Sequence, residues 1–327
     1  SSVLDLLTCT FTSNQSVTSN GGGALYLKGG TFSIRSSVFT TNSAKYDGGA
    51  VLADGASGSL ADSNFSGNLN TESNGGGALH LKDSNASLSS CRFQENLTYA
   101  PNYGGAIKFS NSQSSVSSCV FVSNRSVNNS AGAVYGDGTS ILSVSDSNFT
   151  SNQATQGGAI FIHNGGACSM AGNRFVENSA NAGGAVYLSN FATSKITEND
   201  FHENNSTQFG GALFLTNGSL EIEGGTFYRN SSNYGGAVSV QYSDLITFDG
   251  VKGLGNEANA TSDANGGFLY QGVDSLGADF INCVLSGNRA KYYGGVVRPS
   301  GNLTFTNCTI VGNVSESWGG VVILFDG

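Results

Sequence analysis

The sequence predicts an all-β fold, a right-handed parallel β-helix of about twelve coils, and three observations lead to it. A Gly-Gly pair returns every 25 to 31 residues, with an Ala-Gly pair standing in once. A tetrad of the form Phe-x-x-Asn alternates with these pairs. Apolar and polar residues alternate after each pair, which is the periodicity of a strand and not of a helix. A repeat of this length is typical of a solenoid.

The glycine pairs and the tetrads mark the same two points in every coil. The pairs begin at Gly22, Gly48, Gly76, Gly104, Gly157, Gly183, Gly210, Gly235, Gly266, Gly294 and Gly319, and the tetrads end at Asn14, Asn42, Asn68, Asn96, Asn124, Asn152, Asn178, Asn204 and Asn230, with weaker copies ending at Asn256, Asn288 and Asn313. Glycine is expected where a corner or a close backbone approach leaves no room for a Cβ atom. The asparagine is expected at a turn, with its amide bonded to its own backbone or to the next coil.

Three columns of apolar side chains are expected inside the helix. The third and fifth residues after the first glycine point inward and read Leu25/Leu27, Leu79/Leu81, Ile107/Phe109, Ile160/Ile162, Val186/Leu188, Leu213/Leu215 and Val238/Val240. The tetrad phenylalanine forms the third column. The residue two positions before this phenylalanine is small in six coils, where it is Cys9, Ser37, Ser63, Cys91, Cys119 or Ser147. These columns predict one β-helix domain over residues 1–327.

The two sides of each coil differ in length. A glycine pair is followed by the next phenylalanine after 16 to 19 residues, whereas a tetrad asparagine is followed by the next pair after 5 to 10. The second side is therefore a variable loop, and such insertions often lie on the binding face of a solenoid. The coil near 241–265 is predicted to be the least regular, because the longest loop follows the weakest tetrad.

The composition restricts the partners of this chain. Charged residues make up 11% of the sequence and the net charge is −9, which argues against nucleic acid or an anionic membrane surface as a partner. No apolar run approaches the length of a membrane span, so this segment is not expected to insert into a membrane.

Two cysteine pairs lie at equivalent positions of neighbouring coils, Cys91 with Cys119 and Cys283 with Cys308. Stacked parallel strands place equivalent Cα atoms about 4.8 Å apart, within the disulfide range of about 4.4 to 6.8 Å. Two interpretations stay open: these pairs form disulfides, or each thiol is a small core residue like the serine with which it alternates. Cys9 and Cys168 are expected to be unpaired.

Four of the many Asn-x-Ser/Thr sequons are expected to face solvent and to accept a glycan in a eukaryotic source. Asn64 and Asn148 stand just before a tetrad phenylalanine, and Asn128 and Asn259 lie in variable loops. Sequons at the tetrad asparagine are expected to be blocked, because the turn uses that amide.

An aromatic stripe is expected on one outer face of the helix. The fourth residue after the first glycine should face solvent, and six of these twelve residues are aromatic: Tyr26, Tyr135, Phe161, Tyr187, Phe214 and Tyr270. A connected apolar stripe indicates contact with something, by lateral packing, with a glycan or with a receptor. The alternative is that neighbouring rings stack on one another along the helix and need no partner.

The sequence does not indicate catalysis. Enzymes built on β-helices act chiefly on acidic polysaccharides and need acidic residues beside Arg, Lys or His on one face. The three histidines fall in different coils, and acidic residues such as Asp47, Asp54 and Asp137 adjoin glycines, which indicates turn chemistry. No phosphate loop or nucleophile elbow is present. We therefore expect no enzyme, no metal and no cofactor, with a polysaccharide lyase or hydrolase as the last alternative.

Repeated Gly-Gly-Ala followed by Ile, Leu or Val, as in Gly22-Gly23-Ala24-Leu25, resembles the chlamydial polymorphic outer-membrane proteins when it alternates with Phe-x-x-Asn. The resemblance covers essentially the whole chain. It implies a β-helical passenger that is displayed on the cell surface and used in adhesion. Similar repeats occur in other organisms, so the resemblance determines architecture better than role.

Both ends of the sequence fall on a coil boundary. Joining Gly327 to Ser1 of a second copy would keep the spacing from glycine pair to phenylalanine at 19 residues, within the observed range. The chain is therefore expected to be part of a longer helix or a protomer that stacks head to tail, and such contacts build filaments when they do not close. The predicted function is an extracellular, glycosylated structural protein of this kind, with a surface adhesin for a host receptor or glycan as the alternative.

Overall fold

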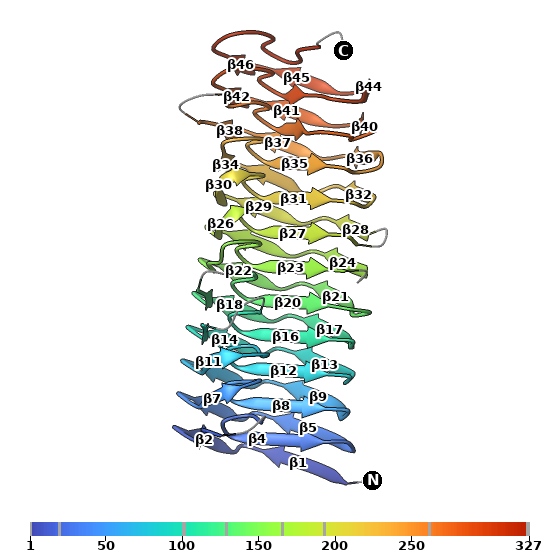
Figure 1. Ribbon diagram of the computed structural model, residues 1–327. Helices are drawn as coiled ribbons and strands as arrows, with labels where there is room; N and C mark the ends of the chain where they lie inside the picture. The colour runs from blue at the N-terminus through green and yellow to red at the C-terminus, as the bar shows by residue number, and fades with distance from the viewer. Residues whose placement is uncertain are drawn as a thin grey trace. The chain divides into compact units, whose positions relative to one another are not determined.

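The computed structural model describes residues 2–18, 21–99, 103–127, 130–164, 167–191, 194–260 and 263–324. All of the elements assigned within these ranges are β-strands (Figure 1). The chain divides into two compact units, Ser1–Cys168 and Ser169–Gly327, and each unit is described by itself.

In the first unit each coil adds short strands to four parallel sheets, A to D. Sheet A contains β1 (Val3–Leu7), β5 (Thr31–Arg35), β9 (Ser57–Ala61), β13 (Ala86–Ser89), β17 (Gln113–Ser117) and β21 (Ile141–Ser145); sheet B contains β2 (Thr10–Thr12), β6 (Val38–Thr40), β10 (Asn64–Ser66), β14 (Arg92–Gln94), β18 (Val120–Val122) and β22 (Asn148–Thr150); sheet C contains β3 (Gln15–Ser16), β7 (Ser43–Tyr46), β11 (Leu69–Ser73), β15 (Leu97–Thr98) and β19 (Arg125–Ser126); sheet D contains β4 (Leu25–Lys28), β8 (Val51–Asp54), β12 (Leu79–Lys82), β16 (Ile107–Ser110), β20 (Val134–Asp137) and β23 (Ile160–His163). Neighbours in a sheet come from successive coils.

The second unit repeats this plan. Sheet A contains β24 (Ala167–Ala171), which begins before the boundary, β28 (Ser194–Thr197), β32 (Leu220–Glu223), β36 (Ile246–Asp249), β40 (Gly277–Ile281) and β44 (Asn302–Thr306); sheet B contains β25 (Arg174–Val176), β29 (Asp200–His202), β33 (Thr226–Tyr228), β37 (Lys252–Leu254), β41 (Val284–Ser286) and β45 (Thr309–Val311); sheet C contains β26 (Ser179–Ala182), β30 (Asn205–Phe209), β34 (Ser231–Ser232), β38 (Glu257–Ala258), β42 (Arg289–Ala290) and β46 (Val314–Ser315); sheet D contains β27 (Val186–Ser189), β31 (Leu213–Thr216), β35 (Val238–Gln241), β39 (Leu269–Gln271) and β43 (Val297–Arg298). Sheet A marks six coils in each unit, so the predicted all-β parallel solenoid of about twelve coils is confirmed.

The predicted core columns are buried in both units, except at the first pair, where Leu25 and Leu27 are half-buried. In the first unit the tetrad rings stack face to face, with centroids 4.7 Å apart between Phe39 and Phe65 and 5.0 Å apart between Phe93 and Phe121. These distances match the separation of hydrogen-bonded strands, about 4.8 Å, because each ring is carried by its own strand of sheet B. The inward positions of sheet D, such as Leu79, are also fully buried.

The tetrad asparagines form the predicted ladder between coils. Asn68 Oδ1 accepts the backbone N–H of Asn42 and its Nδ2–H, both at 3.0 Å. Asn68 Nδ2 in turn donates to the Phe39 carbonyl at 2.9 Å. The residue before each asparagine bends the chain between sheets B and C in the left-handed conformation, as Glu95 does with φ +54°. The amide therefore satisfies backbone groups that this turn leaves without a strand partner.

A second ladder follows the column of small residues. Ser37 Oγ donates to the Arg35 carbonyl at 2.8 Å and accepts the N–H of Cys9 at 3.1 Å. Cysteine occupies the same place with the same bonds: Cys91 Sγ donates to the Ser89 carbonyl at 3.3 Å. In the first unit this column therefore holds short side chains that both donate and accept.

The glycine pairs are required by close backbone contact, as predicted. A Cβ atom on Gly49 would overlap the carbonyl oxygen of Gly77, and one on Gly77 would overlap that of Gly105. Neighbouring coils approach each other too closely here for a side chain on either strand. Any L-residue at these positions would force the coils apart.

The coil predicted to be irregular has lost its tetrad ring, because Gly253 stands where the phenylalanine belongs. Phe268, which replaces the usual alanine after a glycine pair, fills this space. Its ring meets Phe227 edge-on at 5.7 Å and Phe248 at 5.5 Å. The asparagine ladder continues through this coil, since Asn256 Nδ2 donates to the Phe227 carbonyl at 2.9 Å.

Candidate functional site

The outer face of sheet D carries ionic and aromatic side chains in the first unit, and several of them are buried. The residue just before a glycine pair lies over this face. Asp47, before Gly48, contacts His80, and Tyr103, before Gly104, packs its ring edge-on against Tyr135 with centroids 6.3 Å apart. The variable loops therefore cover the face that the alternation pattern assigns to solvent.

The prediction that the aromatic stripe faces solvent is wrong for four of its six members. Tyr135, Phe161, Tyr187 and Phe214 are at most 9% exposed, Tyr270 is half-buried, and Tyr26 is 45% exposed. The rings contact one another and the loops, as Tyr187 and Phe214 do at 4.7 Å and Phe209 and Phe214 do at 5.2 Å. This packing agrees with the alternative interpretation, in which the stripe needs no partner.

One polar pocket lies between the loops and sheet D. Its volume is about 270 Å³, and it is lined by Asp47, Asn74, His80, Lys82, Lys108, Ser110 and Asn111. These residues come from successive coils, because His80 and Lys82 lie on β12 and Lys108 and Ser110 on β16, with His80 paired in register with Lys108. Alternate residues of a strand share a face, so all four side chains point outward together.

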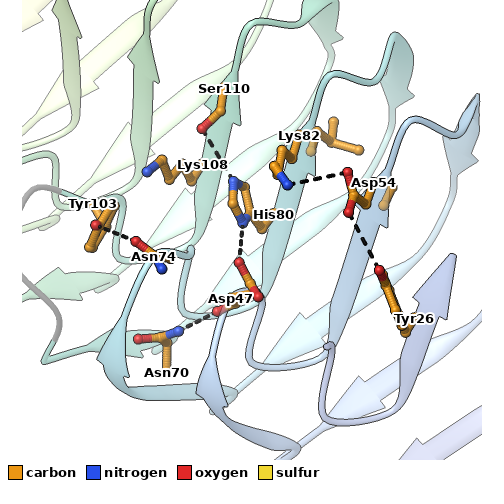
Figure 2. A network of polar contacts seen from close by, with 12 residues as sticks. Tyr26, Asp47, Asp54, Asn70, Asn74, His80, Lys82, Tyr103, Lys108 and Ser110 are labelled. Atoms are coloured by element: carbon orange, nitrogen blue, oxygen red, sulfur yellow. Dashed lines mark hydrogen bonds and ion pairs between the residues drawn. The ribbon is translucent and has the colours of Figure 1, made fainter. Parts of the chain in front are cut away.

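His80 links an acid to a hydroxyl at the centre of this pocket (Figure 2). Its Nδ1 lies 3.1 Å from Asp47 Oδ1, and its Nε2 lies 3.2 Å from Ser110 Oγ, with the two partners on opposite sides of the ring. A carboxylate only accepts hydrogen bonds, so Nδ1 carries the proton and Nε2 of the neutral ring accepts the hydroxyl proton of Ser110. Burial lowers the pKa of His80, although the hydrogen bond that it donates to Asp47 opposes this shift.

Asp47 is held in place by its own backbone. It adopts the left-handed conformation with φ +66°, which aspartate tolerates better than most residues. Its carbonyl oxygen accepts a hydrogen bond from Asn70 Nδ2. The carboxylate is therefore fixed toward His80 by the turn that leads into the glycine pair.

Two lysines bring positive charge to the pocket. Lys108 Nζ lies 3.5 Å from Asp137 Oδ2 and 3.8 Å above the centre of the Tyr103 ring. Burial lowers the pKa of Lys108, and Asp137 partly offsets that shift. Lys82 Nζ lies 3.4 Å from Asp54 Oδ1 on its solvent side.

The expectation that no acidic residue meets a base on one face is wrong at this pocket. Asp47, His80 and Ser110 belong to three successive coils, and the sequence gives no register between a loop and the outer face of a sheet. The sequence feature that could have located His80 and Ser110 is the alternation after the glycine pair, which directs both side chains outward. His80 is the fourth residue after Gly76, and Ser110 is the sixth after Gly104. These positions become diagonal neighbours once the coils stack.

The predicted cysteine pairs occupy the small-residue ladder. Cys9 and the four cysteines of these pairs are free thiols in the structure, with the N–H of Cys91 donating to Cys119 Sγ at 3.4 Å and that of Cys283 to Cys308 Sγ at 3.4 Å. Burial raises the pKa of Cys283 to about 11. These contacts favour the interpretation of small core residues, and oxidation of the two pairs stays a prediction. Cys168 is also buried.

The predicted glycosylation sites differ in exposure. Asn148 on β22 and Asn259 are exposed, whereas Asn64 on β10 is half-buried and its Oδ1 atom is buried. Asn128 lies outside the described residues. Glycosylation of all four stays a prediction.

Within the ranges that the structure describes, no group of three His, Cys, Asp or Glu side chains comes close enough to hold a metal ion. No helix long and apolar enough to cross a membrane is found among the same residues. The expected absence of metals, cofactors and membrane insertion stays a prediction.

The stacked strands and ladders define a class, the parallel β-helix built from short glycine-rich repeats. The family model of the right handed beta helix region matches residues 132–324, more than half of the sequence, so the chain belongs to this family and the predicted handedness is confirmed. The model of the Chlamydia polymorphic membrane protein repeat matches residues 8–28, which confirms the predicted resemblance.

Comparisons with curated proteins and with solved structures say less about this chain. None of the curated proteins matches the sequence. Among solved structures, the A-module of the mannuronan C-5 epimerase AlgE4 from Azotobacter vinelandii is similar at 10% identity and a TM-score of 0.36, with 91% of each chain covered. A likeness this distant bears on neither activity nor substrate.

Proposed function

We propose that this chain is a structural part of a surface-associated protein, a β-helical stalk or a filament protomer. The observation that carries the proposal is the continuous stacking of identical side chains within each unit. Phenylalanine rings repeat at 4.7 to 5.0 Å, and buried asparagine amides bond to one another from coil to coil at about 3.0 Å. Ladders of this kind contribute to the kinetic and thermodynamic stability of stacked β-structure.

The surface location is supported by the match of residues 8–28 to a repeat of a Chlamydia membrane protein. The exposed sequons at Asn148 and Asn259 support a glycosylated form if the source is eukaryotic. The native protein treated with a peptide N-glycosidase should lose mass at these two asparagines. Unmodified asparagine at both positions in peptides from the native protein would contradict the glycosylated form.

Self-association is supported by an apolar patch on the second unit. Val273 and Leu276 are 61% and 63% exposed, and Tyr242 and Leu245 beside them are also exposed. The two turns are adjacent, because the N–H of Tyr242 donates to the Val273 carbonyl at 2.9 Å. A lateral contact between copies would cover these four side chains, whose clustering is unusual for a free surface.

Electron microscopy of the purified chain tests the structural role. Fibres or lateral bundles are expected, with a diffraction spacing of about 4.8 Å between coils. The double variant Val273→Ser, Leu276→Ser should lose lateral bundles and keep its circular dichroism spectrum. The control Ile141→Ser removes an exposed apolar side chain of the first unit and should leave bundles intact. A chain that stays monomeric at all concentrations in analytical ultracentrifugation would contradict self-association.

A surface adhesin is the second candidate. It is supported by the same repeat match and by the placement of the variable loops on one face of the coils. Saturable binding of the labelled chain to host cells or to a glycan array, competed by unlabelled chain, would favour it. Binding that rises linearly with concentration would reject it.

A further inference from the structure

We propose that Ser110, His80 and Asp47 form a nucleophilic site that hydrolyses small carboxylic esters in the pocket of the first unit. This inference goes beyond the structural role proposed above and does not depend on it. It also departs from the expectation of a purely non-enzymatic chain. Four observations carry it: the hydrogen-bond order, the pocket, the neighbouring cations and a contrast with the second unit.

The hydrogen bonds have the order that an activated serine requires. Ser110 Oγ is 3.2 Å from His80 Nε2, and His80 Nδ1 is 3.1 Å from Asp47 Oδ1. A nucleophile within reach of a base, with the base oriented by a third group, is recognised by geometry and not by order along the chain. Here the order along the chain is acid, base, nucleophile.

The base is in the protonation state that the reaction needs. His80 is 3% exposed, and its burial together with the nearby Lys108 ammonium lowers its pKa, so that the neutral ring prevails at pH 7. Asp47 holds the proton on Nδ1 and leaves the Nε2 lone pair directed at Ser110. Burial therefore keeps the histidine available as a general base.

Ser110 is accessible while its partners are shielded. It is half-buried and lines the cavity of about 270 Å³, whereas Asp47 and His80 are buried beneath it. This volume lies just below the usual range for sites of drug-sized ligands, about 300 to 1,000 Å³. The pocket therefore favours a short acyl group, such as an acetyl ester on a larger molecule that stays outside.

Two cations flank the nucleophile. Lys82 is paired in register with Ser110 on the neighbouring strand, and Lys108 lies two residues before Ser110 on the same face of β16. Both line the cavity. Their ammonium groups can stabilise negative charge as it develops on the ester oxygen, which is often the largest contribution to such a reaction.

In two coils of the second unit, the position that corresponds to Ser110 holds hydroxyl side chains that pack and bond to each other. Ser189 and Thr216 are the sixth residues after their glycine pairs, as Ser110 is after its own. Thr216 Oγ1 donates to Ser189 Oγ at 3.1 Å, and both are buried. Ser189 is therefore a matched control for Ser110.

The reaction balances with water as the co-substrate. Ser110 Oγ attacks the carbonyl carbon while its proton passes to His80 Nε2. The bond from carbon to the alcohol oxygen then breaks, and the leaving alkoxide takes the proton from His80. Water attacks the acyl-serine with its proton passing to His80, and the acid leaves as Ser110 recovers a proton. The net change is ester plus water to acid plus alcohol.

The experiment uses the full chain and a fluorophosphonate probe, which forms a bond to an activated serine with loss of fluoride. Mass spectrometry of the digested protein should place the probe on Ser110 and not on Ser189. Hydrolysis of p-nitrophenyl acetate should fall by at least about 100-fold in Ser110→Ala and stay unchanged in Ser189→Ala. His80→Gln should lose both labelling and hydrolysis.

Two results would overturn the proposal. One is that the probe labels Ser110 no faster than Ser189, and the other is that Ser110→Ala and Ser189→Ala hydrolyse the ester equally fast. If His80→Gln fails to fold by circular dichroism, Ser110→Ala still decides, because it removes one half-buried hydroxyl. Failure here would leave the fibres and bundles of the structural role unaffected.

Asp47 is a positioning residue, and its test needs a readout that packing would not change. Asp47→Asn keeps a side-chain oxygen that can accept from His80 Nδ1. It removes the negative charge that raises the pKa of His80, while the charges of Lys108 and Asp137 still act on the ring. The acid limb of the pH–rate profile should therefore move to lower pH while the rate falls. A lower rate with an unmoved limb would assign Asp47 a packing role only.

Discussion

The outer face of sheet D carries an ionic cluster in two coils of the first unit, beside the rings of Tyr135 and Phe161, and an aromatic cluster in two coils of the second. In the first, His80 and Lys108 occupy the fourth position after the glycine pair and meet the carboxylates of Asp47 and Asp137. In the second, Tyr187 and Phe214 occupy this position and contact each other, and Phe214 also contacts Phe209. The backbone ladders beneath are the same, so the scaffold allows either chemistry on this face.

The residue before a glycine pair contributes to both clusters. An aspartate there, as at Asp47, supplies a fixed charge, whereas Phe209 supplies a ring. Asp47 contacts the fourth-position residue of the next coil, whereas Phe209 contacts that of its own coil, and in both cases the contacted side chain is buried. A buried charge persists only when it is paired, so the ionic version constrains its neighbours more tightly than the aromatic one.

The largest effect is expected from emptying the aromatic face. Phe214→Ala should lower the free energy of unfolding by about 3 to 5 kcal/mol, because the 5%-exposed ring packs against Tyr187 and Phe209. Tyr26→Ala, at the same position of its coil but 45% exposed, should cost less than about 1 kcal/mol. Urea titration measures both. Equal losses of unfolding free energy in the two variants would show that the difference in burial between the two positions does not affect stability.

The next effect should be the same in both units, because the asparagine ladder is common to them. Asn124→Ala and Asn204→Ala should each cost about 2 to 4 kcal/mol, since each removes the side-chain partner of a buried phenylalanine carbonyl and of the backbone N–H of the preceding tetrad asparagine. The measurement is again urea unfolding. A difference of more than about 1 kcal/mol between the two variants would mean that the outer faces also affect the ladder.

A pH dependence should separate the two faces. The folded-state pKa of His80 is lowered, so the unfolded state binds the proton more readily, and stability should fall as pH drops below about 6.5 toward the folded value. The charged groups that act on the ring are Asp47, Lys108 and Asp137. His80→Gln should remove this part of the pH dependence, measured as the urea midpoint at pH 7.5, 6.0 and 5.0. An identical pH dependence in wild type and variant would place the effect elsewhere.

Sequence periodicity was sufficient for the interior. Alternation after the glycine pair assigns Leu79 inward and His80 outward, and the tetrad places a ring and an amide at the same point of every coil. Stacking then follows from the constant repeat. The ladders through Phe39 and Asn68 could therefore be predicted without knowing what lies outside the sheets.

Periodicity could not predict what covers the outside. It divides a strand into two faces, but it does not say where a loop of variable length will fold. The contact of Asp47 with His80 depends on a left-handed turn before the glycine pair, and the contact of His80 with Ser110 depends on diagonal neighbours in different coils. The filling of the Gly253 position by Phe268 is likewise a compensation between coils.

The smallest effect is expected in the small-residue ladder, where Cys119→Ser should change stability by less than about 1 kcal/mol. Serine already donates and accepts at this point in the neighbouring coil, where Ser147 Oγ donates to the Ser145 carbonyl at 2.8 Å and accepts the N–H of Cys119 at 3.0 Å. The variant also tests oxidation, because a Cys91–Cys119 disulfide would add stability that reductant removes. Thermal unfolding with and without dithiothreitol should coincide for wild type and for Cys119→Ser if both thiols are free. If dithiothreitol lowers the unfolding temperature by several degrees in wild type but not in Cys119→Ser, the two cysteines form a disulfide. The thiols would then take part in the ladder only under reducing conditions.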